Sequence, residues 1–167
     1  MDNTHSDYVA YYVYKHIIPA ALDMLPGRMY SPEAVAMILA IGLQESKFLH
    51  RRQVPNGPAN GFWQFEKGGG VKGVLTHSST SSTVKAILTD LRYPTDTESC
   101  YQAIRHNDVL ACVFARLLLW TVKGRLPLRN EPDLAWNQYL GAWKPGKPHP
   151  ETWDENFYEA WRFIDQE

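Results

Sequence analysis

The chain has 167 residues, of which 44% are hydrophobic and 21% are charged. This length and balance are typical of one globular domain with a buried core, and they exclude a wholly disordered chain. Because 17 Lys and Arg stand against 18 Asp and Glu, the net charge is −1, which leaves no overall attraction to nucleic acid beyond a local basic patch. We therefore expect a single domain over residues 1–167 that does not bind nucleic acid.

Cysteine content and hydropathy indicate the compartment. The two cysteines, Cys100 and Cys112, are too few for a disulfide-stapled secreted domain, and we expect buried thiols, with one bridge as the alternative. The N-terminus lacks the basic and apolar segments of a signal peptide. The most apolar run, residues 110–120, contains Arg116 and is too short to span a bilayer. We expect a protein made in the cytoplasm without a signal peptide and without stable membrane insertion.

Helical spacing and helix start and stop signals recur along the chain. In chain order they predict helices over residues 7–25, 32–49, 83–93, 107–123, 132–143 and 153–164. Pro19 is expected to kink or split the first helix, whereas Ser31 and Pro32 give the second a capping hydroxyl and a first-turn proline. Residues 107–123 are apolar almost all round, so we expect them to form the central buried helix. Since no pair of alternating strands is found, the sequence predicts a mostly α domain.

Glycine and proline concentrate between residues 55 and 73. This composition predicts a long ordered loop, with a short hairpin around residues 62–65. The glycines at positions 68–70 lack the Lys-Ser/Thr continuation of a phosphate loop, which argues against nucleotide binding. The six histidines are scattered and form no cluster with metal-ligand spacing. We expect no metal and no other cofactor.

One carboxylate, Glu45, stands among apolar positions of the predicted helix 32–49. At about 100° per residue, it falls on the face of Ile38, Ile41 and Leu49, opposite Gln44. A carboxyl group beside aliphatic side chains has a raised pKa, which lets it hold and donate a proton near neutral pH. The residues alone leave two interpretations: a catalytic acid, or a structural carboxylate that pairs with a buried arginine or caps a loop.

The residues around and after Glu45 occur in a recognisable order. The segment Glu45-Ser46-Lys47-Phe48 is followed by Gly61-Phe62-Trp63-Gln64-Phe65 and, in a late helix, by Ala135-Trp136-Asn137-Gln138-Tyr139. This order resembles the lysozyme-like superfamily, specifically the soluble lytic transglycosylases and goose-type lysozymes, over about residues 32–143. Two features depart from the family pattern: Trp136 stands in place of a tyrosine, and Gly141 lies two positions late. The small size and missing export signal resemble phage-encoded members, which are released at lysis or carried in the virion.

The resemblance implies a lysozyme-like fold and cleavage of the β-1,4 bond between N-acetylmuramic acid and N-acetylglucosamine in peptidoglycan, the expected partner. It implies that Glu45 protonates the glycosidic oxygen and, in a transglycosylase, then takes the proton of the muramyl C6 hydroxyl so that a 1,6-anhydro ring closes. It further implies substrate-binding or acid-orienting roles for Ser46, Phe62, Trp63, Gln64, Asn137 and Tyr139. The alternatives are a hydroxyl bonded to its own helix backbone for Ser46 and ordinary core packing for Phe62 and Trp63.

Glu66 is the first carboxylate after Glu45 and the candidate second carboxylate of the site. An inverting hydrolase needs such a group about 6.5–9.5 Å from the acid. An extended segment 62–65 would place Glu66 on the face of Gln64, whereas a turn, which the following glycines favour, would direct it to solvent. We therefore expect a one-carboxylate transglycosylase. The alternatives are an inverting lysozyme or chitinase-like hydrolase with Glu66 as base, and a non-catalytic virion or cell-wall-binding protein on the same fold.

Overall fold

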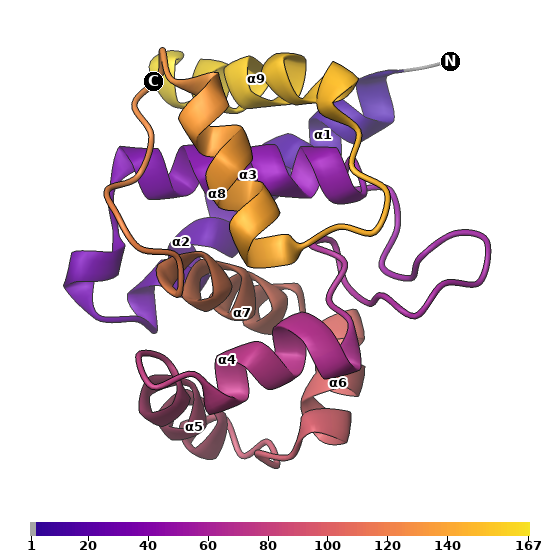
Figure 1. The fold of residues 1–167 in the computed structure, drawn as a ribbon, viewed down its shortest axis with the longest axis vertical. Coiled ribbons are helices and arrows are strands. Elements are labelled where there is room, and N and C mark those ends of the chain that lie inside the picture. Colours follow the sequence, from indigo (N-terminus) through magenta and orange to yellow (C-terminus); the bar gives the residue numbers. More distant parts are fainter. Residues whose placement is uncertain (1–2) are drawn as a thin grey trace.

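The computed structural model describes residues 3–167. Its elements are α1 (Asn3–Tyr12), η1 (Val13–Ile17), α2 (Ile18–Asp23), η2 (Gly27–Met29), α3 (Pro32–Glu45), η3 (Lys67–Val71), α4 (Lys72–Thr76), α5 (Ser81–Asp90), α6 (Thr97–His106), α7 (Asp108–Trp120), α8 (Pro132–Trp143), η4 (Pro150–Thr152) and α9 (Trp153–Asp165) (Figure 1). Over the described range there is no strand, only two isolated bridges, between Arg52 and Asn60 and between Asn60 and Phe65. The prediction of a mostly α fold is confirmed.

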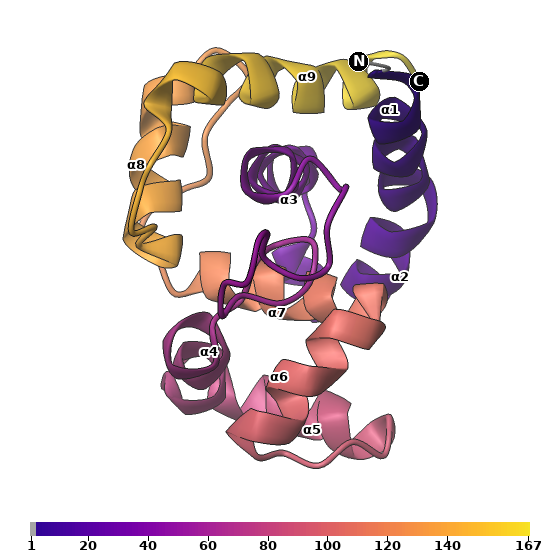
Figure 2. The same cartoon turned by 90° about the vertical axis from the view of Figure 1, so that its right-hand side faces the viewer.

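Helix α3 lies at the centre of the larger part of the molecule. In Figure 2 it is seen nearly end-on, surrounded by α1, α2, α7, α8 and α9. Each residue from Ala34 to Leu43 is buried. The helix starts as predicted, because the Ser31 Oγ accepts a hydrogen bond from the backbone N–H of Ala34 at 3.0 Å and Pro32 occupies the first turn. A helix enclosed on every side explains why its sequence is apolar with little periodicity.

Helix α7 is buried as predicted, but it is not the central helix. Its residues Leu110 to Leu119 are all buried, but α7 belongs to the ring around α3 (Figure 2). It is apolar all round because α2 and α8 pack on one side of it and α4, α5 and α6 on the other. Those three helices form a smaller group beyond α7. Of the three, α4 and α6 were not predicted.

The predicted interruption of the first helix near Pro19 is present. The π-helical segment η1 separates α1 from α2, and Pro19 stands in the first turn of α2, where a missing backbone N–H is tolerated. The end of the second helix differs from prediction. Helix α3 ends at Glu45, because Lys47 and Phe48 adopt left-handed backbone angles, with φ of 53° and 55°. Leu49, assigned to the apolar face, is 47% exposed.

The glycine-rich loop is shorter than predicted. Residues 67–76 form η3 and α4, so the irregular part ends at Glu66. Asn60 and Phe65 exchange two backbone hydrogen bonds of 2.9 and 2.8 Å around a tight turn, which matches the short hairpin expected there. Both Cys100 and Cys112 are buried free thiols. Of the helices within residues 3–167, none is long and apolar enough to cross a membrane.

Candidate active site

The side chain of Glu45 lines a cleft of about 1050 Å³. Glu45 is the last residue of α3, so it lies where the central helix emerges from the core into this cleft. The walls come from the hairpin turn, η3, α8 and the segment 144–149 that follows α8, and they include Gln64, Glu66, Tyr139 and His149. Elements far apart in the sequence thus converge on one carboxyl group.

The cleft changes the proton affinity of Glu45. Burial raises its pKa from an ordinary 4.5 to about 7, and the negative charge of Glu66 acts in the same direction. Two neighbours oppose the rise: the hydroxyl of Tyr139 donates a hydrogen bond to Glu45 Oε1 at 2.5 Å, and the charge of His149 also favours the carboxylate. With a pKa near 7, Glu45 is present in both forms at neutral pH, so the same group is able to give and to take a proton.

Aromatic packing fixes the hydroxyl that contacts Glu45. The side chain of Tyr139 is 3% exposed, and its ring stacks on that of Trp153 with centroids 5.2 Å apart and planes 8° apart. The rings of Trp136 and Trp143 lie 5.4 and 6.2 Å away. Burial and the charge of Glu45 raise the pKa of Tyr139, so its hydroxyl keeps its proton and stays a donor. The packing of α8 against α9 therefore sets the position of the Glu45 carboxyl.

Gln64 and Glu66 both line the cleft. Residues 61–64 form the expected turn, with Gln64 in a left-handed conformation at φ 54° and its Nε2 donating to Gly61 O at 2.9 Å. Gly61 has φ of 80°, and a Cβ there would lie 2.8 Å from Cγ2 of Ile104, so the turn requires glycine. The turn was expected to send Glu66 away from the site. Glu66 is exposed, yet it borders the same cleft as Glu45.

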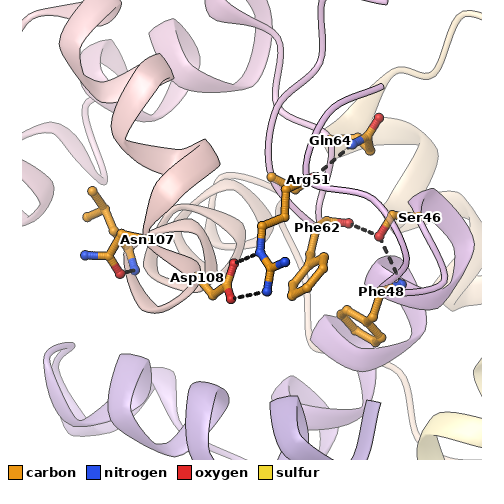
Figure 3. A network of polar contacts seen from close by, with 9 residues as sticks. Ser46, Phe48, Arg51, Phe62, Gln64, Asn107 and Asp108 are labelled. Carbon is orange, nitrogen blue, oxygen red and sulfur yellow. Dashed lines mark hydrogen bonds and ion pairs between the residues drawn. The ribbon is translucent and has the colours of Figure 1, made fainter. Parts of the chain in front are cut away.

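Three of the predicted site residues lie beneath the cleft and do not line it: Ser46, Phe62 and Trp63. The Ser46 hydroxyl donates to Phe62 O at 2.6 Å and accepts from the backbone N–H of Phe48 at 3.1 Å (Figure 3). The Trp63 indole N–H donates to Ile38 O at 2.8 Å, and its side chain is 0% exposed. Phe48 packs edge-on against the rings of Phe62 and Trp63, with centroids 5.4 and 5.8 Å away. These side chains hold the hairpin against the end of α3.

A salt bridge that the sequence did not indicate extends this support. Arg51 donates two hydrogen bonds of 2.9 Å to the Asp108 carboxylate, and its guanidinium lies 4.2 Å from the centroid of the Phe62 ring (Figure 3). Asp108 stands in the first turn of α7, which Asn107 caps. The segment that follows Glu45 is thereby fixed to the start of α7.

The structure does not bring Asn137 to the cleft. Asn137 is exposed on α8 and is not among the residues that line the opening. Tyr139, two positions later, lies on nearly the opposite side of the helix, because each residue advances about 100°. Of the two residues selected on α8, the structure thus joins only Tyr139 to Glu45.

Gln44, next to Glu45, also lines the cleft, which the sequence did not indicate. Its Nε2 donates to His149 O at 2.9 Å, and its Oε1 accepts from Thr152 Oγ1 at 3.0 Å and from Asn156 Nδ2 at 2.8 Å. These bonds secure the segment after α8 across the end of α3. Residues 144–150 are rich in proline, but no local pattern shows that this segment returns to the cleft of Glu45.

Within the described part of the chain, no group of three or more His, Cys, Asp or Glu side chains could hold a metal ion. Comparison with known proteins found no match among family models, curated proteins or solved structures. The chemistry of the site therefore carries the functional argument.

Proposed function

We propose that this protein cleaves the β-1,4 bonds of peptidoglycan glycan strands, with Glu45 as the general acid. The observation that carries the proposal is a carboxyl group with a pKa of about 7 in a cleft of about 1050 Å³. Such a group is protonated often enough near neutral pH to donate to a glycosidic oxygen. The cleft is at the upper end of the roughly 300–1000 Å³ of small-molecule pockets, which suits a polymer that occupies several sugar positions.

The first reaction that the site supports is a lytic transglycosylation. Glu45 gives its proton to the bridging oxygen, and the bond between C1 and that oxygen breaks with the electron pair going to the oxygen. The resulting carboxylate is stabilised by the Tyr139 hydroxyl, 2.5 Å from its Oε1. It then takes the proton of the muramyl C6 hydroxyl, whose oxygen bonds to C1. No water is consumed, and the product ends in 1,6-anhydromuramic acid.

A second candidate, an inverting lysozyme, is favoured by the position of Glu66. This carboxylate lines the same cleft, and its charge raises the pKa of Glu45. In that reaction Glu45 is the acid and Glu66 takes a proton from a water molecule, which attacks C1 from the other face of the sugar. One water is consumed and the product has a reducing end. Gln64, between the two carboxylates in the sequence, is a candidate sugar contact in both schemes.

Clearing of purified peptidoglycan in a gel tests the proposal. We expect the wild-type protein to clear the gel and folded Glu45→Gln to lose about 10²–10⁴-fold in rate, because the amide keeps the shape but cannot transfer the proton. Clearing at the wild-type rate by Glu45→Gln would remove the catalytic assignment. Co-sedimentation without clearing by the wild-type protein would indicate a wall-binding protein instead. Cleavage of soluble chitooligosaccharides in preference to peptidoglycan would indicate a chitinase-like hydrolase.

Glu66→Gln separates the two reactions within the proposal. This variant keeps its lytic activity if Glu45 acts alone, and it loses activity if Glu66 is the base. Because Glu66 is exposed, its replacement leaves the fold intact, so a loss of clearing reports on chemistry.

A further inference from the structure

A second pocket, of about 280 Å³, lies between η2, the C-terminal end of α7 and the loop that follows α7. Three arginines line it, Arg28, Arg116 and Arg125, together with Ser31 and Trp120. None of the side chains that line it is acidic, and it shares no residue with the cleft of Glu45. The pocket is therefore a separate site with an excess of positive charge.

Arg116 is the most unusual group of this pocket. The residue is 2% exposed, its Nε donates to Met29 O at 2.7 Å, and its buried Nη1 has no hydrogen-bond partner among the residues that the structure describes. Burial lowers its pKa to about 10, which still leaves the guanidinium charged at neutral pH. A buried charge without a counter-ion is strongly unfavourable. The arrangement therefore calls for an anion at this position.

A second arginine and an indole complete one wall. The guanidinium carbons of Arg28 and Arg116 lie 5.8 and 5.3 Å from the centroid of the Trp120 ring. Within residues 3–167, neither Arg28 nor Arg116 forms a salt bridge with a carboxylate. Arg125, in contrast, donates two hydrogen bonds of 2.7 Å to the carboxylate of Glu131. Two arginines without a carboxylate partner therefore line one small pocket.

Ser31 adds a hydroxyl donor to the same space. Its Oγ accepts the N–H of Ala34 at 3.0 Å, which occupies a lone pair and leaves the O–H proton for another acceptor. Ser31 also caps the start of α3, the end of the helix where the backbone dipole favours negative charge. Guanidinium groups, a hydroxyl and a helix start together suit the oxygens of a phosphate group.

We propose that this pocket binds a phosphate oxyanion through Arg28, Arg116 and Ser31. Its volume lies at the lower limit of small-molecule sites, so it takes a single phosphate or the phosphomonoester end of a larger molecule. Two positive charges without carboxylates match the two negative charges of such a group. The bound anion joins η2 to α7 and thereby stabilises the fold. The site is independent of glycan cleavage, so its test needs no activity measurement.

Calorimetric titration of the full chain with sodium phosphate at constant ionic strength tests the proposal. We expect saturable binding in the millimolar range or tighter, and a higher melting temperature in phosphate than in chloride, because a ligand that binds only the folded state stabilises it. Arg28→Gln, a change at an exposed position, should weaken binding at least tenfold. Arg162→Gln on α9 is the matched control and should bind as the wild-type protein does. Absence of saturable binding, or equal binding by Arg28→Gln, would overturn the proposal.

Vesicles distinguish the two sources of the phosphate group. Sedimentation with vesicles of phosphatidic acid, but not with phosphatidylcholine alone, and its loss in Arg28→Gln would assign a lipid headgroup. Titration of phosphate without such sedimentation would assign a soluble phosphate or phosphate ester. Both outcomes support the oxyanion site. Arg28-independent sedimentation combined with no response to phosphate would contradict it.

Discussion

Replacing Glu45 with glutamine should stabilise the fold at alkaline pH, because the cleft disfavours the charged form of the carboxyl group. The pKa of Glu45 is about 7 in the folded protein, against an ordinary 4.5. Below pH 4.5 the folded and unfolded chains both carry the proton, and the titration has no effect. As the pH rises towards 7 the unfolded chain ionises first, so the wild-type protein loses stability, and above pH 7 the loss is complete.

The magnitude follows from the difference between the two pKa values. One pKa unit corresponds to about 1.4 kcal/mol, so this shift predicts a loss of about 2–3 kcal/mol in the free energy of unfolding between pH 4 and pH 8, with the lower figure allowing for the access of cleft water to Glu45. Glutamine does not titrate and avoids the loss. The free energy of unfolding of Glu45→Gln minus that of the wild-type protein should therefore increase by about 2–3 kcal/mol from pH 4 to pH 8.

Urea unfolding at pH 4 and pH 8 measures the effect. Any pH-independent consequence of the amide, such as its altered hydrogen bond with Tyr139, cancels in the difference between the two pH values. Glu155→Gln, which removes an exposed carboxylate on α9, is the control and should show little change between them. If the difference between Glu45→Gln and the wild-type protein is the same at both pH values, Glu45 has no raised pKa and the electrostatic reasoning is wrong.

Four further substitutions test the surroundings of Glu45. Tyr139→Phe removes the hydrogen bond that lowers the pKa of Glu45. Since such a bond is worth about 1.5–3 kcal/mol, the alkaline limb of the pH–rate profile should move to a pH about one unit higher. An alkaline limb at the wild-type pH would contradict the contact. Gln64→Ala should reduce turnover more than stability. Asn137→Ala, outside the cleft, should leave the rate of peptidoglycan clearing unchanged. If Asn137→Ala slows clearing and Gln64→Ala does not, the substrate binds elsewhere. Ser46→Ala should lower the free energy of unfolding, measured in urea, by about 1–3 kcal/mol, while the activity per folded molecule is retained. A loss of activity without a loss of stability would show that the Ser46 hydroxyl contacts the substrate.

The sequence predicted those elements whose limits are set by local chemistry. Helix α8 was expected over residues 132–143 and spans Pro132–Trp143, because Pro132 starts the helix and Pro145 disfavours a helical conformation of the residue before it. The end of α3 could not be predicted in the same way. Lys47 and Phe48 adopt left-handed angles without glycine or asparagine to indicate them, since tertiary packing of the Phe48 ring in the core imposes that conformation.

The pattern of a helix by itself indicated only one residue of the candidate site, Glu45. Glu45 was found because a carboxylate stood among apolar positions, and the structure places it in a cleft of about 1050 Å³. Its contact with Tyr139 spans 94 positions of the chain and depends on how α8 packs against α9, which no local pattern contains. Phe62 and Trp63 carry the aromatic character of either a sugar platform or a core, and only their burial separated the two.

Mass spectrometry of the fragments released from purified peptidoglycan tests the central claim most directly. The proposal predicts that the wild-type protein releases muropeptides that end in 1,6-anhydromuramic acid, one water lighter than hydrolytic products. Glu45→Gln should release them about 10²–10⁴-fold more slowly. Reducing muramic acid ends, with loss of activity in Glu66→Gln, would change the reaction to that of an inverting lysozyme. Intact glycan strands after digestion with the wild-type protein, or equal release by Glu45→Gln, would contradict the role of Glu45.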